Sequence, residues 1–180
     1  MVFETTRLCA REMQQRDFAD LAAMLQDPQV MYAYEHTFTE SDVQAWLDRQ
    51  RKRYAEHGFG LWSVILKSTG EMIGQAGLTM QPYKSTMVPE IGYLLKKAFW
   101  HCGYATEAAA GCRKYAFSVL HLSKVYAIIK ADNTASIKVA QRIGMQKEDE
   151  FLTQYYAGER LHLLYSAENG RQCAAERRNL

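Results

Sequence analysis

The chain has 180 residues, with 22 Lys and Arg against 20 Asp and Glu, which gives a net charge of +2. This length suits one domain, and so small a charge argues against a dedicated nucleic-acid binder, whose affinity comes mostly from neutralising phosphates. No apolar run approaches the roughly 18 residues that cross a bilayer, and the N-terminus lacks the pattern of a secretory signal, so we expect no membrane association.

Hydrophobic periodicity and turn residues predict alternating strands and helices. In chain order these are a strand at 6–12, a helix at 17–25, a helix that follows capping residues 39–42 and runs to about 57, strands at 61–67, 71–80 and 90–95, a helix at 105–120, a strand at 124–131, a helix at 134–143, and a hairpin of 151–153 with 161–166. Residues 68–70 are expected to form a hairpin turn, 81–89 a loop, and Gly144 a left-handed helix cap.

The order of these elements places a strand–helix–strand crossover at 90–131, which implies at least one parallel pair. The expected fold class is α/β (α+β), a single domain over residues 1–168. Its sheet is mixed and mostly antiparallel, with about six or seven strands flanked by about four helices, and 169–180 form a polar tail. A ligand is expected beyond the carboxyl end of the strand that feeds the crossover helix.

The cysteines and histidines give no sign of a disulfide or a metal. Cys9, Cys102, Cys112 and Cys173 are scattered without a Cys-x-x-Cys pair, and the five histidines show no ligand spacing. We therefore expect no disulfide and no metal, and the free thiols fit a reducing cytoplasm.

Residues 99–107 precede the strongest predicted helix, and two interpretations of this segment stand side by side. Main-chain N–H groups in a first helical turn lack partners and attract anions, while Gly103 and Ala105 let the backbone approach a ligand closely. A single glycine before a helix is more often only a turn. The segment is neither a Walker loop nor the dinucleotide fingerprint, because it lacks their further Gly and Lys residues.

The chain resembles the GNAT superfamily of acetyl-CoA-dependent N-acetyltransferases over residues 6–166, nearly its whole length. Within the superfamily it is similar to the branch of the bacterial ribosomal-protein N-terminal acetyltransferases. The segments that carry the resemblance are Glu90-Ile91-Gly92-Tyr93, Trp100-His101-Cys102-Gly103-Tyr104-Ala105-Thr106-Glu107-Ala108, Asn133-Thr134-Ala135-Ser136 and Ile143-Gly144-Met145.

The resemblance implies a CoA site in which the loop binds the pyrophosphate. The strands at 90–95 and 124–131 are implied to splay apart, with the pantetheine arm between them. His101 and Cys102 stand where the branch often has Gly-Lys, which removes one cation that His101 could partly replace. The implied CoA-binding residues are Leu94 and Leu95 (through their main chain), Trp100, His101, Cys102, Gly103, Tyr104, Ala105, Thr106, Asn133 and Ser136, the last near the thioester sulfur.

Structural roles remain open for three of these residues. Asn133 could be only a helix N-cap, and Ser136 a surface residue of the first helical turn. Cys102 is more easily a small buried side chain than a nucleophile, which would need an adjacent base, and the resemblance implies direct transfer.

Direct transfer requires a neutral amine. An α-amine has a pKa of about 7.7–8.0 and lysine about 10.4, so the need for a base depends on the acceptor. Glu90 is the first candidate for that base, with a solvated strand-end carboxylate as the alternative. Glu35 and His36 form a second set of candidates for the base, in a segment that the resemblance places on the acceptor side. The residues expected to bind the acceptor are Tyr34, Glu35, His36 and Glu90. The strand at 125–131 contains no carboxylate, which excludes a base there.

The leaving thiolate, with a pKa near 8.5 by analogy with Cys, needs only a hydrogen bond or a weak acid. Ser136 can donate such a bond, and Tyr155 and Tyr156 are the alternatives.

The run Arg49-Gln50-Arg51-Lys52-Arg53 could bind ribosomal RNA or an acidic partner, but a solvated helix face is the interpretation we favour. The aromatic residues Tyr32, Tyr34, Phe38 and Trp46 are expected mainly to pack, with some lining the acceptor cleft.

Two functions therefore remain. One is an acetyl-CoA-dependent N-acetyltransferase that acts on a protein or peptide N-terminal amine, or on a small amine such as a polyamine, an antibiotic or an amino acid. The other is a CoA-binding or ribosome-docking module without turnover. The sequence fits either a monomer or a homodimer.

Overall fold

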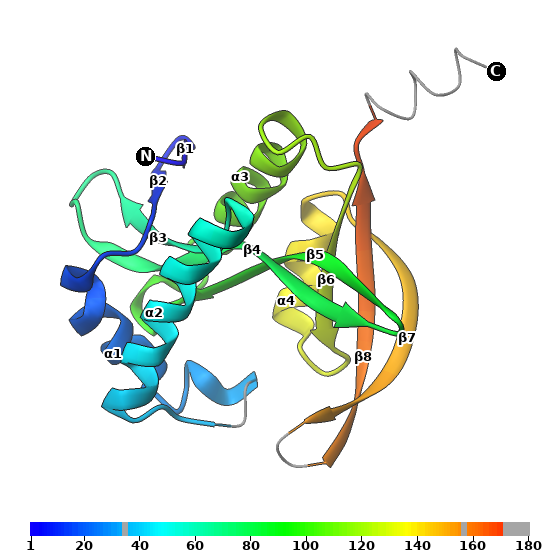
Figure 1. The fold of residues 1–180 in the computed structure, drawn as a ribbon, viewed down its shortest axis with the longest axis horizontal. Coiled ribbons are helices and arrows are strands. Elements are labelled where there is room, and N and C mark those ends of the chain that lie inside the picture. Colours follow the sequence, from blue (N-terminus) through cyan, green and yellow to red (C-terminus); the bar gives the residue numbers. More distant parts are fainter. Residues whose placement is uncertain (34–35, 156–157, 171–180) are drawn as a thin grey trace.

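One eight-stranded sheet forms the centre of the computed structural model, which describes residues 1–33, 36–155 and 158–170 (Figure 1). Its strand order is β1-β2-β3-β4-β5-β6-β8-β7, and every pairing is antiparallel except that of β5 with β6. The strands are β1 (Phe3–Glu4), β2 (Leu8–Arg11), β3 (Leu61–Leu66), β4 (Met72–Tyr83), β5 (Thr86–Leu95), β6 (Lys124–Lys130), β7 (Gln146–Tyr155) and β8 (Gly158–Glu168). The expected mixed sheet with one parallel pair is confirmed, with eight strands in place of six or seven.

The described part of the chain contains four α-helices: α1 (Phe18–Leu25), α2 (Glu40–His57), α3 (Tyr104–Ser118) and α4 (Thr134–Arg142). Thr39 and Asp42 form a reciprocal capping box at the start of α2, and Gly58 ends that helix in the left-handed conformation. Gly144, at φ 77°, occupies the expected left-handed position after α4.

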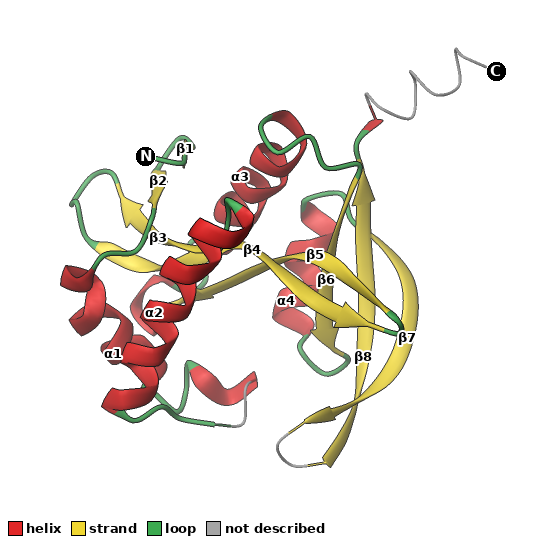
Figure 2. Cartoon of the chain, in the orientation of Figure 1, coloured by secondary structure: helices red, strands yellow, loops and turns green. Residues whose placement is uncertain are grey.

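The helices cover two faces of the sheet, and Figure 2 shows α2 crossing in front of β4. Side chains alternate along β3, so that Trp62 and Val64 join the core under α3 and α4, while Leu61 joins the core under α1 and α2. The ring of Trp62 packs edge-on against Tyr115 of α3, with centroids 5.2 Å apart. These two cores hold α2 and α4 on either side of the β5–β6 junction.

Two sequence expectations about the strands are wrong, and one is incomplete. The expected strand at 6–12 is β2, but the short strand β1 that pairs with it was not expected. Residues 81–89 are not a loop, because β4 and β5 pair as far as Tyr83 and Thr86 in a long hairpin. The last hairpin is also much longer than 151–153 with 161–166, since β7 and β8 pair from Gln146 with Ser166 to Tyr155 with Gly158.

Asn169, the first residue of the expected tail, is buried, and its main-chain N–H donates to the Ser123 carbonyl at 2.8 Å. Residues 171–180 lie outside the described part of the chain.

Candidate functional site: a cavity at the parted strands

A cavity of about 1140 Å³ lies where β5 and β6 meet. These strands pair at a single point, Glu90 with Tyr126, so the β5 edge beyond Glu90 has main-chain groups with no described strand partner on that side. Leu94 and Leu95 belong to this edge and line the cavity. Pockets for small-molecule ligands measure about 300–1,000 Å³, so this cavity lies just above that range and is large enough for an extended ligand.

The loop before α3 borders one end of the cavity. His101 and Gly103 both have positive φ, 61° and 80°, and only glycine adopts such a conformation without strain. α3 then begins at Tyr104 without a side-chain cap. His101, Gly103, Tyr104, Ala105 and Thr106 line the cavity, and the unpaired N–H groups of a first helical turn are an anion-binding arrangement.

Trp100 and Cys102 fix the shape of this loop. The Trp100 indole lines the cavity and donates to the Leu95 carbonyl at 2.9 Å. Cys102 is exposed and does not line the cavity, and its thiol donates to the Trp100 carbonyl at 3.3 Å. The expectation of a buried Cys102 side chain is therefore wrong.

Arg7 clamps the same loop, and no sequence motif indicated it. Its Nη1 donates to the Cys102 carbonyl at 2.9 Å, its guanidinium lies 4.4 Å from the centre of the Tyr104 ring, and its Nε is 2.6 Å from Glu107 Oε2. Burial opposes ionisation of Glu107, but hydrogen bonds from Thr5 and Arg7 outweigh it and lower the pKa of that carboxyl. Arg7 thus offsets an ionised carboxylate that would otherwise repel an anion at the start of α3. The pairing spans 100 positions, so no local pattern could reveal it.

Glu90 lies within β5, not at a strand end as the solvated alternative supposed. Its Oε1 accepts the N–H of Ile128 in β6 at 3.0 Å. Burial raises the pKa of Glu90 to about 7, although the Ile128 N–H and the charge of Arg53 act in the opposite direction. A carboxylate with a pKa near neutrality, facing a cavity, can accept and release protons at physiological pH.

The first turn of α4 contributes Asn133 and Ser136 to the cavity. Asn133 Oδ1 accepts the Ser136 N–H at 3.1 Å, so the helix-cap interpretation of Asn133 is confirmed, and it also accepts the Tyr32 hydroxyl at 3.2 Å. The Ser136 side chain is half-buried, lines the cavity and interacts with the Tyr93 hydroxyl, which argues against a purely surface role. Burial raises the pKa of Tyr93 to about 12, so its hydroxyl stays protonated.

The expected acceptor-side set is only partly described. Tyr34 and Glu35 lie outside the described residues, as do Tyr156 and the side chain of Tyr155. His36 is exposed, packs its ring 5.5 Å from that of Phe38, and does not line the cavity.

α2 instead provides three side chains that line the cavity: Trp46, Arg49 and Arg53. The basic run is therefore divided. Arg51 and Lys52 form the solvated face that the sequence indicated, whereas Arg49 and Arg53 also line the cavity. Because residues four apart lie on the same face of a helix, the sequence could have shown that Arg49 and Arg53 belong together.

No helix in the ranges 1–33, 36–155 and 158–170 is long and apolar enough to span a bilayer. Within those ranges, no group of three or more His, Cys, Asp or Glu side chains could hold a metal ion.

Comparisons with known proteins agree with this geometry. A model of the acetyltransferase (GNAT) domain matches residues 7–146. The chain is 37% identical over 142 residues to the uncharacterized protein YkkB of Bacillus subtilis, which covers 78% of this chain and 83% of that protein. It is 30% identical over 152 residues to the uncharacterized N-acetyltransferase YnaD of the same organism, with 84% and 86% covered. A solved GNAT-family acetyltransferase from Bacillus anthracis superposes with a TM-score of 0.79 at 25% identity, over 92% of this chain and 97% of that one.

The mixed sheet with one parallel pair, together with the family match, defines the class of protein as a GNAT-fold acetyltransferase. The chain belongs to the GNAT family, and it is an acyltransferase.

Proposed function

We propose that this chain transfers the acetyl group of acetyl-CoA directly to a primary amine held beside Glu90. One observation carries the proposal: the loop before α3 and Glu90 open into the same cavity. Leu95, bonded to the loop through Trp100, and Glu90 are five residues apart on β5, which is about 17 Å along a strand. A long ligand with its phosphates at the loop therefore presents its other end near Glu90.

The residues present fit acetyl-CoA, which supplies an activated thioester when bound. The uncapped first turn of α3 and Gly103 would hold the pyrophosphate through main-chain N–H groups. The free edge of β5 at Leu94 and Leu95 would bond to the pantetheine amides, and Asn133 lies beside that path.

Glu90 is the proposed proton acceptor. At pH 7 and above a large fraction is ionised, so it can take the proton that the amine loses as the new bond forms. For an α-amine this assistance is modest, whereas a lysine amine must lose its proton against nearly three further pKa units.

Ser136 is the proposed donor to the departing sulfur. A thiolate with a pKa near 8.5 needs little more than a hydrogen bond. Tyr93 is a positioning residue in this scheme, because its hydroxyl interacts with that of Ser136 and would orient it.

The fold alone does not identify the acceptor. RimL, a ribosomal alpha-N-protein acetyltransferase solved with coenzyme A, shares the fold at 15% identity, and so does spermidine N-acetyltransferase from Vibrio cholerae at 13%. An N-terminal peptide amine and a small-molecule amine are both compatible with the cavity.

The test is release of free CoA from acetyl-CoA with a panel of N-terminal peptides, amino acids, polyamines and aminoglycosides. We expect thiol release with at least one class. Measurable CoA binding by calorimetry without thiol release from any amine would contradict the proposal and favour a non-catalytic binding module.

A further inference from the structure

We propose that the acceptor amine also carries an anionic group, a carboxylate or a phosphate, which Arg49 and Arg53 bind. This inference rests on the proposed function, since it concerns the acceptor of that same site.

The two arginines form one charged edge of the cavity. They lie four residues apart on α2, so they share one face of that helix. Trp46 lines the same wall, donates to Gln75 Oε1 at 2.9 Å, and lies 5.7 Å beneath the Arg49 guanidinium. Arg53 is half-buried, and its Nη1 donates to Gln50 Oε1 at 3.2 Å. Arg49, which is exposed, thus contacts the Trp46 ring, and Arg53 contacts the Gln50 amide, beside the cavity.

In the described part of the chain no carboxylate lies within 4.0 Å of either guanidinium group. The charge of Glu90 acts on Arg53 without forming such an ion pair. Burial and the neighbouring charge of Arg49 lower the pKa of Arg53, which indicates that the two like charges lie close together. An anionic ligand would relieve that repulsion and would match the forked guanidinium geometry.

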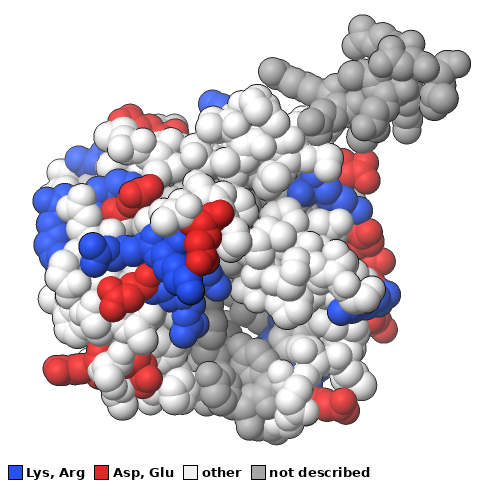
Figure 3. All heavy atoms as spheres, viewed as in Figure 1, with Lys and Arg blue, Asp and Glu red and all other residues white. Residues whose placement is uncertain are grey.

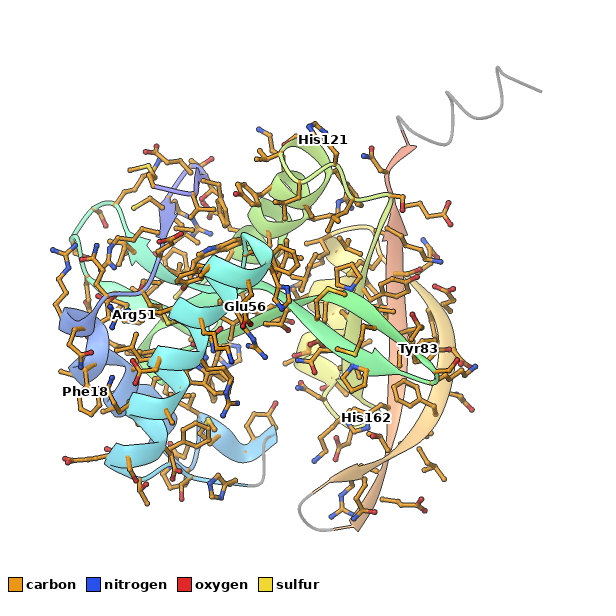
Figure 4. The ribbon with its side chains drawn as sticks, viewed as in Figure 1. Phe18, Arg51, Glu56, Tyr83, His121 and His162 are labelled. Carbon is orange, nitrogen blue, oxygen red and sulfur yellow. The ribbon has the colours of Figure 1, made fainter. Side chains whose placement is uncertain are left out.

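The outward face of α2 gives the contrast. Arg51 pairs with Asp48 at 3.8 Å and Lys52 with Glu56 at 3.6 Å, both exposed. Figure 4 places Arg51 on the side of α2 away from β6. Figure 3 shows Lys and Arg side chains grouped where Figure 1 places α2, beside a hollow in the surface. On α2, therefore, Arg51 and Lys52 each have an ion pair, whereas Arg49 and Arg53 have none within 4.0 Å in the described part of the chain.

The position of the pair separates it from the phosphates of CoA. Arg53 interacts electrostatically with Glu90, which lies about 17 Å along β5 from Leu95 and the loop. The described cavity lining contains five Lys or Arg residues (Arg49, Arg53, Lys130, Lys138 and Arg142) and one carboxylate, Glu90. A polyamine would enter against this positive field, whereas an amine with an anionic group would be attracted.

The experiment compares matched amines by the kcat/KM for free CoA release. The pairs are glycine with glycinamide, phenylalanine with phenylalaninamide, and phosphoethanolamine with ethanolamine, and spermidine serves as the polycation. The first two pairs test a carboxylate, and the third tests a phosphate. We expect the anionic member of at least one pair to exceed its neutral partner at least tenfold, because a charged hydrogen-bond partner is lost in the neutral one.

Arg49→Gln and Arg53→Gln should each raise the KM for the anionic amine at least tenfold while the KM for acetyl-CoA stays within twofold. Arg51→Gln, on the outward face, is the matched control and should change neither. Preference for neutral or cationic amines, or variants that behave like Arg51→Gln, would overturn the inference and leave the transferase standing. A raised KM for acetyl-CoA instead would assign the pair to CoA and also overturn it.

Absence of thiol release from every amine would instead count against the proposed function. Calorimetry of N-acetylglycine and N-acetylglycinamide in the presence of CoA then decides the inference alone. Tighter binding of N-acetylglycine than of N-acetylglycinamide, with the difference lost in Arg53→Gln, would support the inference. Equal binding of the two ligands would overturn it.

Discussion

Replacing Glu90 by Gln tests its proposed role as proton acceptor with little other disturbance to the structure. The amide keeps the shape of the side chain and an oxygen that can accept the Ile128 N–H, which Glu90 Oε1 now accepts at 3.0 Å. General bases contribute about 10²–10⁴-fold to rates, so we expect kcat/KM to fall by about 100-fold at pH 8. Burial raises the pKa of Glu90 to about 7, and only the ionised form can accept a proton. The ratio of wild-type to variant rate should therefore rise through pH 7 and level off above it.

Titration of the acceptor amine affects both proteins equally, so it cancels in this ratio. The two rates are measured as thiol release from acetyl-CoA between pH 5.5 and 9. A ratio that stays constant across this range would refute the role of Glu90 as base.

The same substitution has an independent consequence for stability. Between pH 4.5 and about 7 the folded chain holds a proton on Glu90 that the unfolded chain has released, so stability falls as pH rises through this window. At 1.36 kcal/mol per pKa unit, ionised Glu90 costs up to about 3 kcal/mol at pH 8. Urea unfolding should show Glu90→Gln to be more stable than wild type at pH 8 and equally stable near pH 4.5. Equal stability at both pH values would show that Glu90 is not buried as described.

Three further substitutions test the loop and the fold. Gly103→Val should weaken CoA binding at least tenfold by calorimetry, because a branched side chain is strained at the φ of 80° that Gly103 adopts. The control is Gly70→Val, at φ 72° in the distant β3–β4 turn, which should lower stability without changing CoA affinity. Equal CoA affinity in both variants would contradict the loop assignment. Arg7→Gln should weaken CoA about tenfold by leaving the Glu107 carboxylate unpaired beside the phosphates, and adding Glu107→Gln should restore most of the affinity. Asp17→Asn should lower the urea unfolding free energy by about 3–5 kcal/mol, because the buried carboxylate accepts two guanidinium bonds of 2.6 and 2.7 Å; a loss under 1 kcal/mol would show this ion pair to be unimportant.

The sequence predicted the parts of the fold that local chemistry determines. Helix caps, the crossover and the glycine loop all follow from residues within a few positions of one another. The β4–β5 hairpin was missed because contacts with residues distant in the sequence stabilise it. Tyr83 near its tip bonds with Asp149 and packs its ring 5.2 Å from that of Phe151, both in β7 (Figure 4). Proline at positions 82 and 89 also weakens any strand pattern there.

The site shows the same division. The motifs identified Glu90, Gly103 and Asn133, but not the environment that gives each its properties. The pKa of Glu90 depends on burial, on an amide of β6 and on Arg53 in α2. Arg7 contacts the loop although it lies 95 positions before Cys102 in the sequence. These contacts join segments that are distant in the sequence, and no sequence motif links them, so only the folded structure shows that they meet.

The central claim is that main-chain groups around Gly103 bind a diphosphate. The most direct measurement is calorimetry of CoA against pantetheine, which lacks the phosphates, in wild type and in Gly103→Val. Two or more N–H bonds to charged oxygens, at about 1.5–3 kcal/mol each, predict that wild type binds CoA at least 100-fold more tightly than pantetheine and that Gly103→Val removes most of this preference. Similar affinities for the two ligands in wild type, or a preference that survives in Gly103→Val, would contradict the claim.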